Sequence, residues 1–106
     1  MTWTMAFHEA ARVEFDALPE DLQARFNRIR DLIVEHGLER LPPKLLKHID
    51  GKLWEFRLKG NDTIGRAFYI TRTGRRIIIL RVFVKKTQKT PSREIRLALA
   101  RAEEIE

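Results

Sequence analysis

Cysteine is absent from the 106 residues, which excludes disulfide bridges, thiolate zinc sites and thiol catalysis. Long hydrophobic runs are absent too, because the longest, Ile77–Leu80, is far too short to cross a membrane. The N-terminal residues lack the apolar core of a signal peptide, so we expect a cytoplasmic protein. No nucleotide-binding glycine pattern and no metal-ligand spacing occurs, so we expect neither a cofactor nor a metal.

Positive charge is what the chain has in excess. Lys and Arg number 21 against 15 Asp and Glu, a net charge of +6 in a chain of single-domain length, residues 1–106. Most of these cations lie between Lys44 and Lys89, where only three acids, Asp50, Glu55 and Asp62, occur. This clustering predicts a face that binds a polyanion, and RNA is the partner that we expect. A merely solvated basic surface is the alternative.

The N-terminal third shows a strand pattern followed by helix patterns. Apolar residues at every second position predict a strand over Thr2–Phe7. Apolar spacings of three and four residues then predict two helical stretches, Ala11–Leu18 and Leu22–Ile33. Pro19 suits the first turn of the second stretch, and His36 followed by a glycine suits its end.

The following segment, Leu38–Lys52, reads as a connector. It contains two successive prolines and the turn signal Asp50-Gly51, so we expect loop structure there with one short helix.

Three strands and a last helix are predicted after the connector. In Leu53–Lys59 the apolar residues Trp54, Phe56 and Leu58 alternate with Glu55, Arg57 and Lys59, which places a charged row opposite the core. Two turns then predict an antiparallel meander through Ile64–Thr71 and Arg76–Val84, followed by a helix with Thr90 as cap and Pro91 as its first residue. The predicted fold class is α+β: a small antiparallel or mixed sheet of about four strands packed against N-terminal helices, with a C-terminal helix.

Several strings in the C-terminal half are specific enough to suggest a family. Leu53–Arg57 (LWEFR), Gly65–Tyr69 (GRAFY) and Phe83–Pro91 (FVKKTQKTP), in this order and spacing, resemble the phage-derived, HigB-like branch of the RelE/ParE toxin superfamily. The resemblance covers nearly the whole chain. It implies a RelE-like domain that acts as a ribosome-dependent messenger RNA endonuclease and inhibits growth. It also implies a cognate antitoxin, which we expect to be a helix-turn-helix DNA-binding protein.

Metal-independent RNA cleavage needs residue types that this region supplies. The 2′-hydroxyl attacks the adjacent phosphate, so a base, an acid and cations that stabilise the phosphorane are required. Glu55 is the candidate base, Arg57 and Arg66 offer planar forks for phosphate oxygens, and Lys85 or Lys86 would stabilise charge or donate a proton. Further RNA contacts are expected at four positions: Lys59, Arg81, Phe83 and Lys89.

Each candidate also has a structural interpretation. Glu55 and Arg66 would form only a surface ion pair, or Arg66 would only bridge two strands. In both cases the Arg66 guanidinium is expected to lie outside the core. Phe83 would be an ordinary packed aromatic, and Tyr69 is expected to point into the core. Some superfamily members carry a catalytic His or Tyr near the C-terminus, but residues 101–106 contain neither. Of the three histidines, only His48 lies just before the charged strand, and we expect it to be a solvated histidine without a special role.

Two other functions remain open at this point. A ParE-like toxin would bind DNA gyrase and cut nothing, but it would not need a carboxylate, two arginines and a lysine to converge. A phage-derived relative that binds RNA without cleaving it would use the same basic face.

Overall fold

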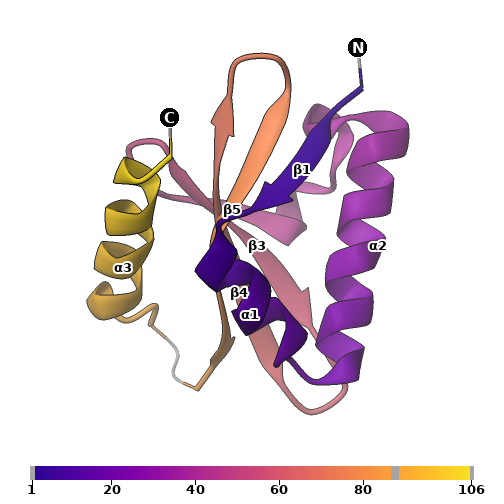
Figure 1. Cartoon of the computed structure of the whole chain (residues 1–106). Helices are drawn as coiled ribbons and strands as arrows, with labels where there is room; N and C mark the ends of the chain where they lie inside the picture. The colour runs from indigo at the N-terminus through magenta and orange to yellow at the C-terminus, as the bar shows by residue number, and fades with distance from the viewer. Residues whose placement is uncertain (1, 87–88, 106) are drawn as a thin grey trace.

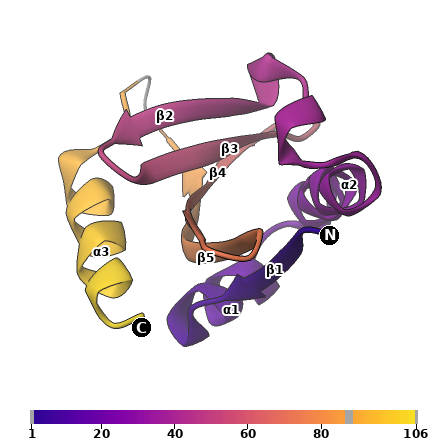
Figure 2. The ribbon, with the colours of Figure 1, turned by 90° about the horizontal axis from the view of Figure 1, so that it is seen from above.

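The computed structural model describes residues 2–86 and 89–105, so Thr87 and Gln88 of the FVKKTQKTP string lie outside the described residues. Five strands form one sheet between two helical layers (Figures 1 and 2). Helices α1 (Glu9–Asp16) and α2 (Glu20–His36) pack on one face, and α3 (Ser92–Glu103) packs on the other. Among the described residues, no helix is long and apolar enough to cross a membrane.

The sheet is mixed and has the strand order β1-β5-β4-β3-β2. Its strands are β1 (Thr4–Phe7), β2 (Leu46–Asp50), β3 (Leu53–Lys59), β4 (Ile64–Arg72) and β5 (Arg76–Lys85). Strand β1 pairs in parallel with β5, and all other neighbours are antiparallel. The α+β class, the meander and the flanking helices are therefore confirmed, with five strands instead of about four.

Strand β2 corrects the expectation of a connector. The segment holds two short 3₁₀ helices, Leu38–Arg40 and Pro43–Leu45, and then β2, which forms a hairpin with β3. Gly51 at the turn has φ of 55°, the left-handed conformation that two-residue hairpin turns require. The strand is only five residues long and its burial is irregular, so hydrophobic alternation was too weak to indicate it.

The helix ends differ from expectation by one position at each proline. Helix α2 begins at Glu20 and α3 at Ser92, with Pro19 and Pro91 in extended N-cap conformations immediately outside. Neither cap donates or accepts a side-chain hydrogen bond. Helix α2 ends at His36 as predicted, where Gly37 takes a φ of 96° that a side chain would disfavour.

Two hydrophobic clusters hold the layers together, one on each face of the sheet. The cluster under α1 and α2 contains Phe56, Leu58 and Tyr69, with the rings of Phe56 and Tyr69 stacked at 4.0 Å. Tyr69 is thus in the core as predicted, and burial raises the pKa of its hydroxyl. The cluster under α3 contains Leu53, Phe68 and other residues of β4 and β5. Because α3 covers only this second cluster, the rest of that face carries the charged side chains described next.

Candidate active site

A buried carboxylate lies between two arginines on the α3 face of the sheet. Glu55 of β3 is only 1% exposed, and its Oε2 lies 3.4 Å from Nε of Arg66 and 3.7 Å from Nε of Arg57. Register places Arg57 of β3 directly opposite Arg66 of β4. Two like charges at opposed positions repel each other, so the carboxylate between them offsets a cost that the strands would otherwise carry.

The expectation that these charged groups lie outside the core is wrong for Glu55 of the charged row and for Arg66 of the next strand. Arg66 is 7% exposed and donates a hydrogen bond from Nη1 to the Gly65 carbonyl at 2.9 Å. Both side chains are buried because they stand among Phe68 and Phe83 on the same face of neighbouring strands, with Phe68 opposite Glu55 and Phe83 opposite Arg66. A surface ion pair therefore does not describe this contact. Only Arg57 of the three is substantially exposed, at 42% of its side chain.

One oxygen of the buried carboxylate remains unused. Oε1 of Glu55 has no hydrogen-bond partner among the described residues, and neither has Nε of Arg57 or Arg66 at hydrogen-bond geometry. Buried polar groups are normally satisfied, so exceptions concentrated on one triad point to a ligand site. Burial together with Arg57 lowers the pKa of Arg66, while Glu55 opposes this shift.

Lys85, the last residue of β5, belongs with Glu55, Arg57 and Arg66 to a group of charged residues that we call the charged cluster. Partial burial and the nearby Arg66 lower the pKa of Lys85, Arg57 and Lys47 act in the same direction, and Glu55 opposes them. Register places Lys85 opposite Ile64 and two residues beyond Phe83, the partner of Arg66, so Lys85 lies on the same face of the sheet as Glu55, Arg57 and Arg66. A lysine with a lowered pKa gives up a proton more readily than an ordinary lysine does.

Lys47 is a member of this cluster that the sequence interpretation missed. It lies on β2 directly opposite Glu55, a position that exists only because β2 is a strand. The turn signal Asp50-Gly51 was present in the sequence, but a strand extended backward from Asp50 without interruption would have placed His48 opposite Glu55. The register shift between His48 and Asp50, which the sequence does not indicate, brings Lys47 to that position instead.

Arg81 does not join the cluster. It donates two hydrogen bonds to Glu94 of α3, at 2.9 and 3.0 Å, and forms an ion pair with Glu14 of α1 at 2.6 Å. Arg101 of α3 grips the same Glu14 with two bonds of 2.8 Å. This clasp, formed by Glu14, Arg81, Glu94 and Arg101, joins α1, β5 and α3, so Arg81 has two carboxylate partners within the protein itself.

The remaining candidates lie at the rim or in the core. Phe83 is 8% exposed and meets Phe68 edge-to-face at 5.3 Å, which makes it the packed aromatic of the two alternatives. Lys86 is exposed just beyond β5, and Lys59 is exposed at the end of β3. Lys89 is exposed before α3 and has interactions of its own. His48 is exposed, and its Nε2 lies 2.7 Å from the Gly51 carbonyl within the hairpin.

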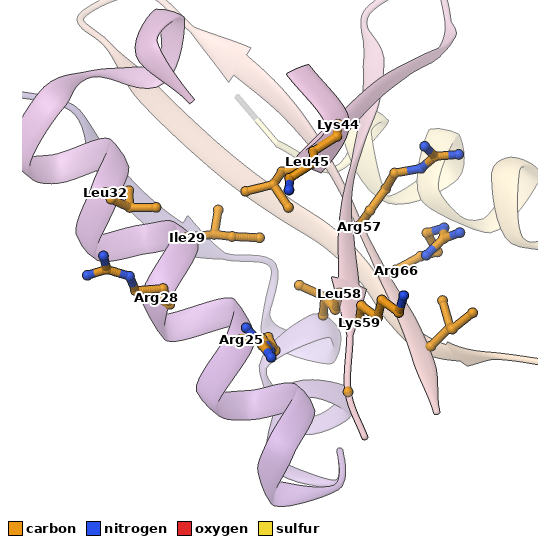
Figure 3. A pocket seen from close by; sticks show the side chains of 12 residues that line it. Arg25, Arg28, Ile29, Leu32, Lys44, Leu45, Arg57, Leu58, Lys59 and Arg66 are labelled. Carbon is orange, nitrogen blue, oxygen red and sulfur yellow. The ribbon is translucent and has the colours of Figure 1, made fainter. Parts of the chain in front are cut away.

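A groove of about 740 Å³ adjoins the cluster along the edge of β3. It lies between α2 and the part of β3 beyond Phe56, where β2 has ended, and Figure 3 shows Arg25 reaching from the helix toward the strands. Six cations line it and no acid does: Arg25, Arg28, Lys44, Arg57, Lys59 and Arg66. Arg57 and Arg66 belong to both the groove and the cluster. Within residues 2–86 and 89–105, no three His, Cys, Asp or Glu side chains gather as a metal site would require.

The family comparison covers the whole of this arrangement. A model of the family described as "Phage derived protein Gp49-like (DUF891)" matches residues 13–103. The chain belongs to the phage-derived Gp49-like family. The match begins in α1 and ends in α3, so it spans the cluster, the groove and the clasp. It confirms the phage-derived branch inferred from the sequence strings.

A solved structure independently places this Gp49-like chain in the RelE fold. The archaeal RelE–RelB complex from Pyrococcus horikoshii OT3 matches with a TM-score of 0.56 and 23% identity, covering 77% of this chain and 93% of that one. Identity at this level supports the fold, and function has to be argued from the site. No curated protein matches the sequence.

Proposed function

We propose that this Gp49-like protein is the toxin of a toxin–antitoxin pair and acts as an endoribonuclease on messenger RNA in the ribosome. The observation that carries the proposal is the buried Glu55, held between Arg57 and Arg66 with one oxygen free and with Lys85 on the same face of the sheet. A gyrase-binding protein would have no use for a carboxylate desolvated among cations, because burying such a group is costly unless it is compensated.

In the proposed reaction the ribose 2′-oxygen attacks the neighbouring phosphorus. Glu55 Oε1 accepts the 2′-hydroxyl proton as the O2′–P bond forms and the P–O5′ bond breaks. The products are a 2′,3′-cyclic phosphate and a 5′-hydroxyl, whose proton comes from Lys85. A phosphate bound at this site draws the half-exposed Arg57 toward its oxygens, which opens the path to the Glu55 oxygen.

The two arginines have separate duties in this scheme. Arg66 is fixed by Glu55 and the Gly65 carbonyl, so it offers a preorganised fork to the charge that develops on the phosphorane. Arg57 is more exposed and is the arginine that a substrate meets first. Lys86 and Lys89, at the rim, would contribute phosphate contacts that need only positive charge.

The proposed partner is a cognate antitoxin, a helix-turn-helix DNA-binding protein that keeps the enzyme inactive. The archaeal RelE neighbour is solved in complex with RelB, and the shared fold supports a corresponding partner here. We expect it to cover the cluster, since blocking Arg57 alone would deny substrate access to Glu55.

In vitro translation with mapping of 5′ ends on the message tests the function. Wild-type protein should produce new ends within translated codons, and Glu55→Gln should not. Cleavage of free RNA in the absence of ribosomes would show that the activity does not depend on the ribosome. Growth arrest with intact messages and inhibited gyrase supercoiling would establish the ParE-like alternative instead.

A further inference from the structure

The groove between α2 and β3 is not used by the reaction just described, although it carries more cations than the cluster does. Its lining contains four that take no part in the proposed chemistry: Arg25, Arg28, Lys44 and Lys59. They come from α2, the second 3₁₀ helix and β3, so three separate elements contribute cations to the lining of one channel. No carboxylate lines it to neutralise them.

The contrast with other arginines of the chain is informative. Arg81 and Arg101 are held by Glu14 and Glu94, and the exposed Arg30 of α2 lies 3.7 Å from Asp31. Arg25 and Arg28 form no ion pair or hydrogen bond within the described chain. They lie one turn apart on α2, on the stripe that also presents Ile29 and Leu32 to the groove. Uncompensated cations gathered in a concave channel favour a polyanionic ligand.

The wall opposite α2 is equally well defined. Strand β3 continues for three residues beyond its last pair with β2, so its edge from Arg57 to Lys59 borders the groove directly. The turn after β3 is fixed to α2, since Asp21 Oδ2 accepts a hydrogen bond from the Asn61 amide at 2.8 Å. A Cβ at Gly60 would collide with the same carboxylate, so a larger residue there would have to displace Asp21 from its bond with Asn61.

We propose that this groove is the binding track for the single-stranded RNA that flanks the cleaved phosphate. The inference rests on the proposed function. Arg57 and Arg66 line the groove, and their guanidinium groups lie with Glu55 on the α3 face, so a strand bound in the groove would reach the cluster by passing around the edge of β3. Phosphates contact the arginines and lysines, and the partly exposed apolar residues of the lining, Leu32, Leu45 and Ile64, receive riboses and base edges. Arg25 and Arg28 are thus assigned as RNA-binding residues.

Binding of uncleavable RNA tests the track separately from catalysis. The probe is single-stranded RNA methylated at every 2′-oxygen, supplied as a trinucleotide and as a longer strand, with affinity measured across a salt series. The variant is Arg25→Gln with Arg28→Gln, which keeps helix-forming side chains. The control is Arg30→Gln with Arg40→Gln, an equal loss of charge at exposed positions outside the groove.

Each phosphate contact on a single strand contributes about 0.7 to the salt slope, or about fivefold in affinity near 0.1 M salt. The groove variant should therefore bind the longer strand about 25-fold more weakly with a slope smaller by about 1.4, while its trinucleotide affinity stays the same. The control should bind both probes as wild type does.

Two results would overturn the track. One is an equal loss of affinity for the longer strand in the groove variant and the control, which would show that only the net charge of the protein matters. The other is preferential occupation of the groove by an acidic peptide that leaves RNA affinity unchanged, which would assign it to a protein partner. Normal binding of the longer strand by wild type together with absent cleavage would refute the nuclease function and leave the track intact.

Discussion

Replacing Arg66 separates its contribution to the fold from its proposed contribution to catalysis. Arg66 is 7% exposed, and its guanidinium lies 3.4 Å from the buried Glu55 carboxylate. Arg66→Ala would therefore leave this carboxylate without its nearest cation, and it would also remove a hydrogen-bond donor to the bound phosphate. Removing one partner of a buried pair costs about 3–5 kcal/mol. Because Arg57 still lies 3.7 Å from the same carboxylate, we expect a loss near the lower limit. A domain with stability of about 5–15 kcal/mol would remain folded.

Arg66→Ala should lower the rate of cleavage by a large factor while most of the protein remains folded. Removing one preorganised donor to a developing oxyanion typically lowers the rate by about a hundredfold to a thousandfold. Arg66→Lys preserves the charge that Glu55 needs, so the variant should be nearly as stable as wild type. It should still be slower, because an ammonium cannot bind two phosphate oxygens as a planar fork does.

The assay is single-turnover cleavage of message on programmed ribosomes, with urea denaturation of each variant measured in parallel. Arg72→Ala, at the far end of the same strand and outside the cluster, is the matched control and should retain both activity and most of the stability. A folded Arg66→Ala protein that cleaves as fast as wild type would show that Arg66 only bridges strands, and the placement of the active site would be wrong.

Three further outcomes follow from the ion pairs and pKa shifts. Arg101→Ala should cost on the order of 3 kcal/mol in urea denaturation because Glu14 loses two 2.8 Å bonds, whereas Arg30→Ala should cost at most about 1 kcal/mol; equal losses would refute the clasp. Burial would raise the pKa of Glu14, but bonds from Arg101 and the Val82 amide lower it below 4.5, so its contribution to stability is present above that pH and is lost in more acidic solution. Glu14→Gln should remove this acid-dependent loss from pH-dependent unfolding curves. If Lys85 is the proton donor, cleavage should decline as pH rises through its lowered pKa, and Lys85→Arg should move that decline to higher pH; an unshifted profile would assign the proton to another group.

Strong periodicity made most of the fold predictable. Strand β3 lies at Leu53–Lys59 as the alternation of Trp54 and Phe56 with charged residues predicts, and α2 ends at His36 before Gly37. Both signals are local, since side-chain period and capping chemistry belong to one segment. Strand β2 was missed because its short sequence carries little periodicity and forms a strand through pairing with β3.

Burial of the site was the harder property to predict. A strand that alternates Glu55 and Arg57 with apolar residues normally turns its charges toward water, yet Glu55 is as buried as the core. The reason is tertiary: β4 contributes a second arginine at the opposed position, and β5 contributes Phe83 beside it. Likewise Arg25 and Arg28 appear in the sequence as ordinary surface residues of α2. They line a groove because β2 ends opposite Phe56 and leaves the edge of β3 uncovered beside α2.

Two strands of the sheet, β5 and β3, extend beyond the neighbour with which they pair. At one of these edges the charged side chains form structural ion pairs, and at the other they are available for binding. Strand β5 extends beyond β1, and there the Leu80 carbonyl accepts a bond from Arg101 while the Val82 amide donates to Glu14, so an ion network completes that edge. Strand β3 extends beyond β2 in the same way, but six cations and no acid line the groove beside it. Unpaired strand edges favour unwanted association, and positive charge at an edge opposes it. The β3 edge is therefore kept open by the same cations that would bind RNA, and a substitution that neutralises the groove should weaken RNA binding and promote self-association together.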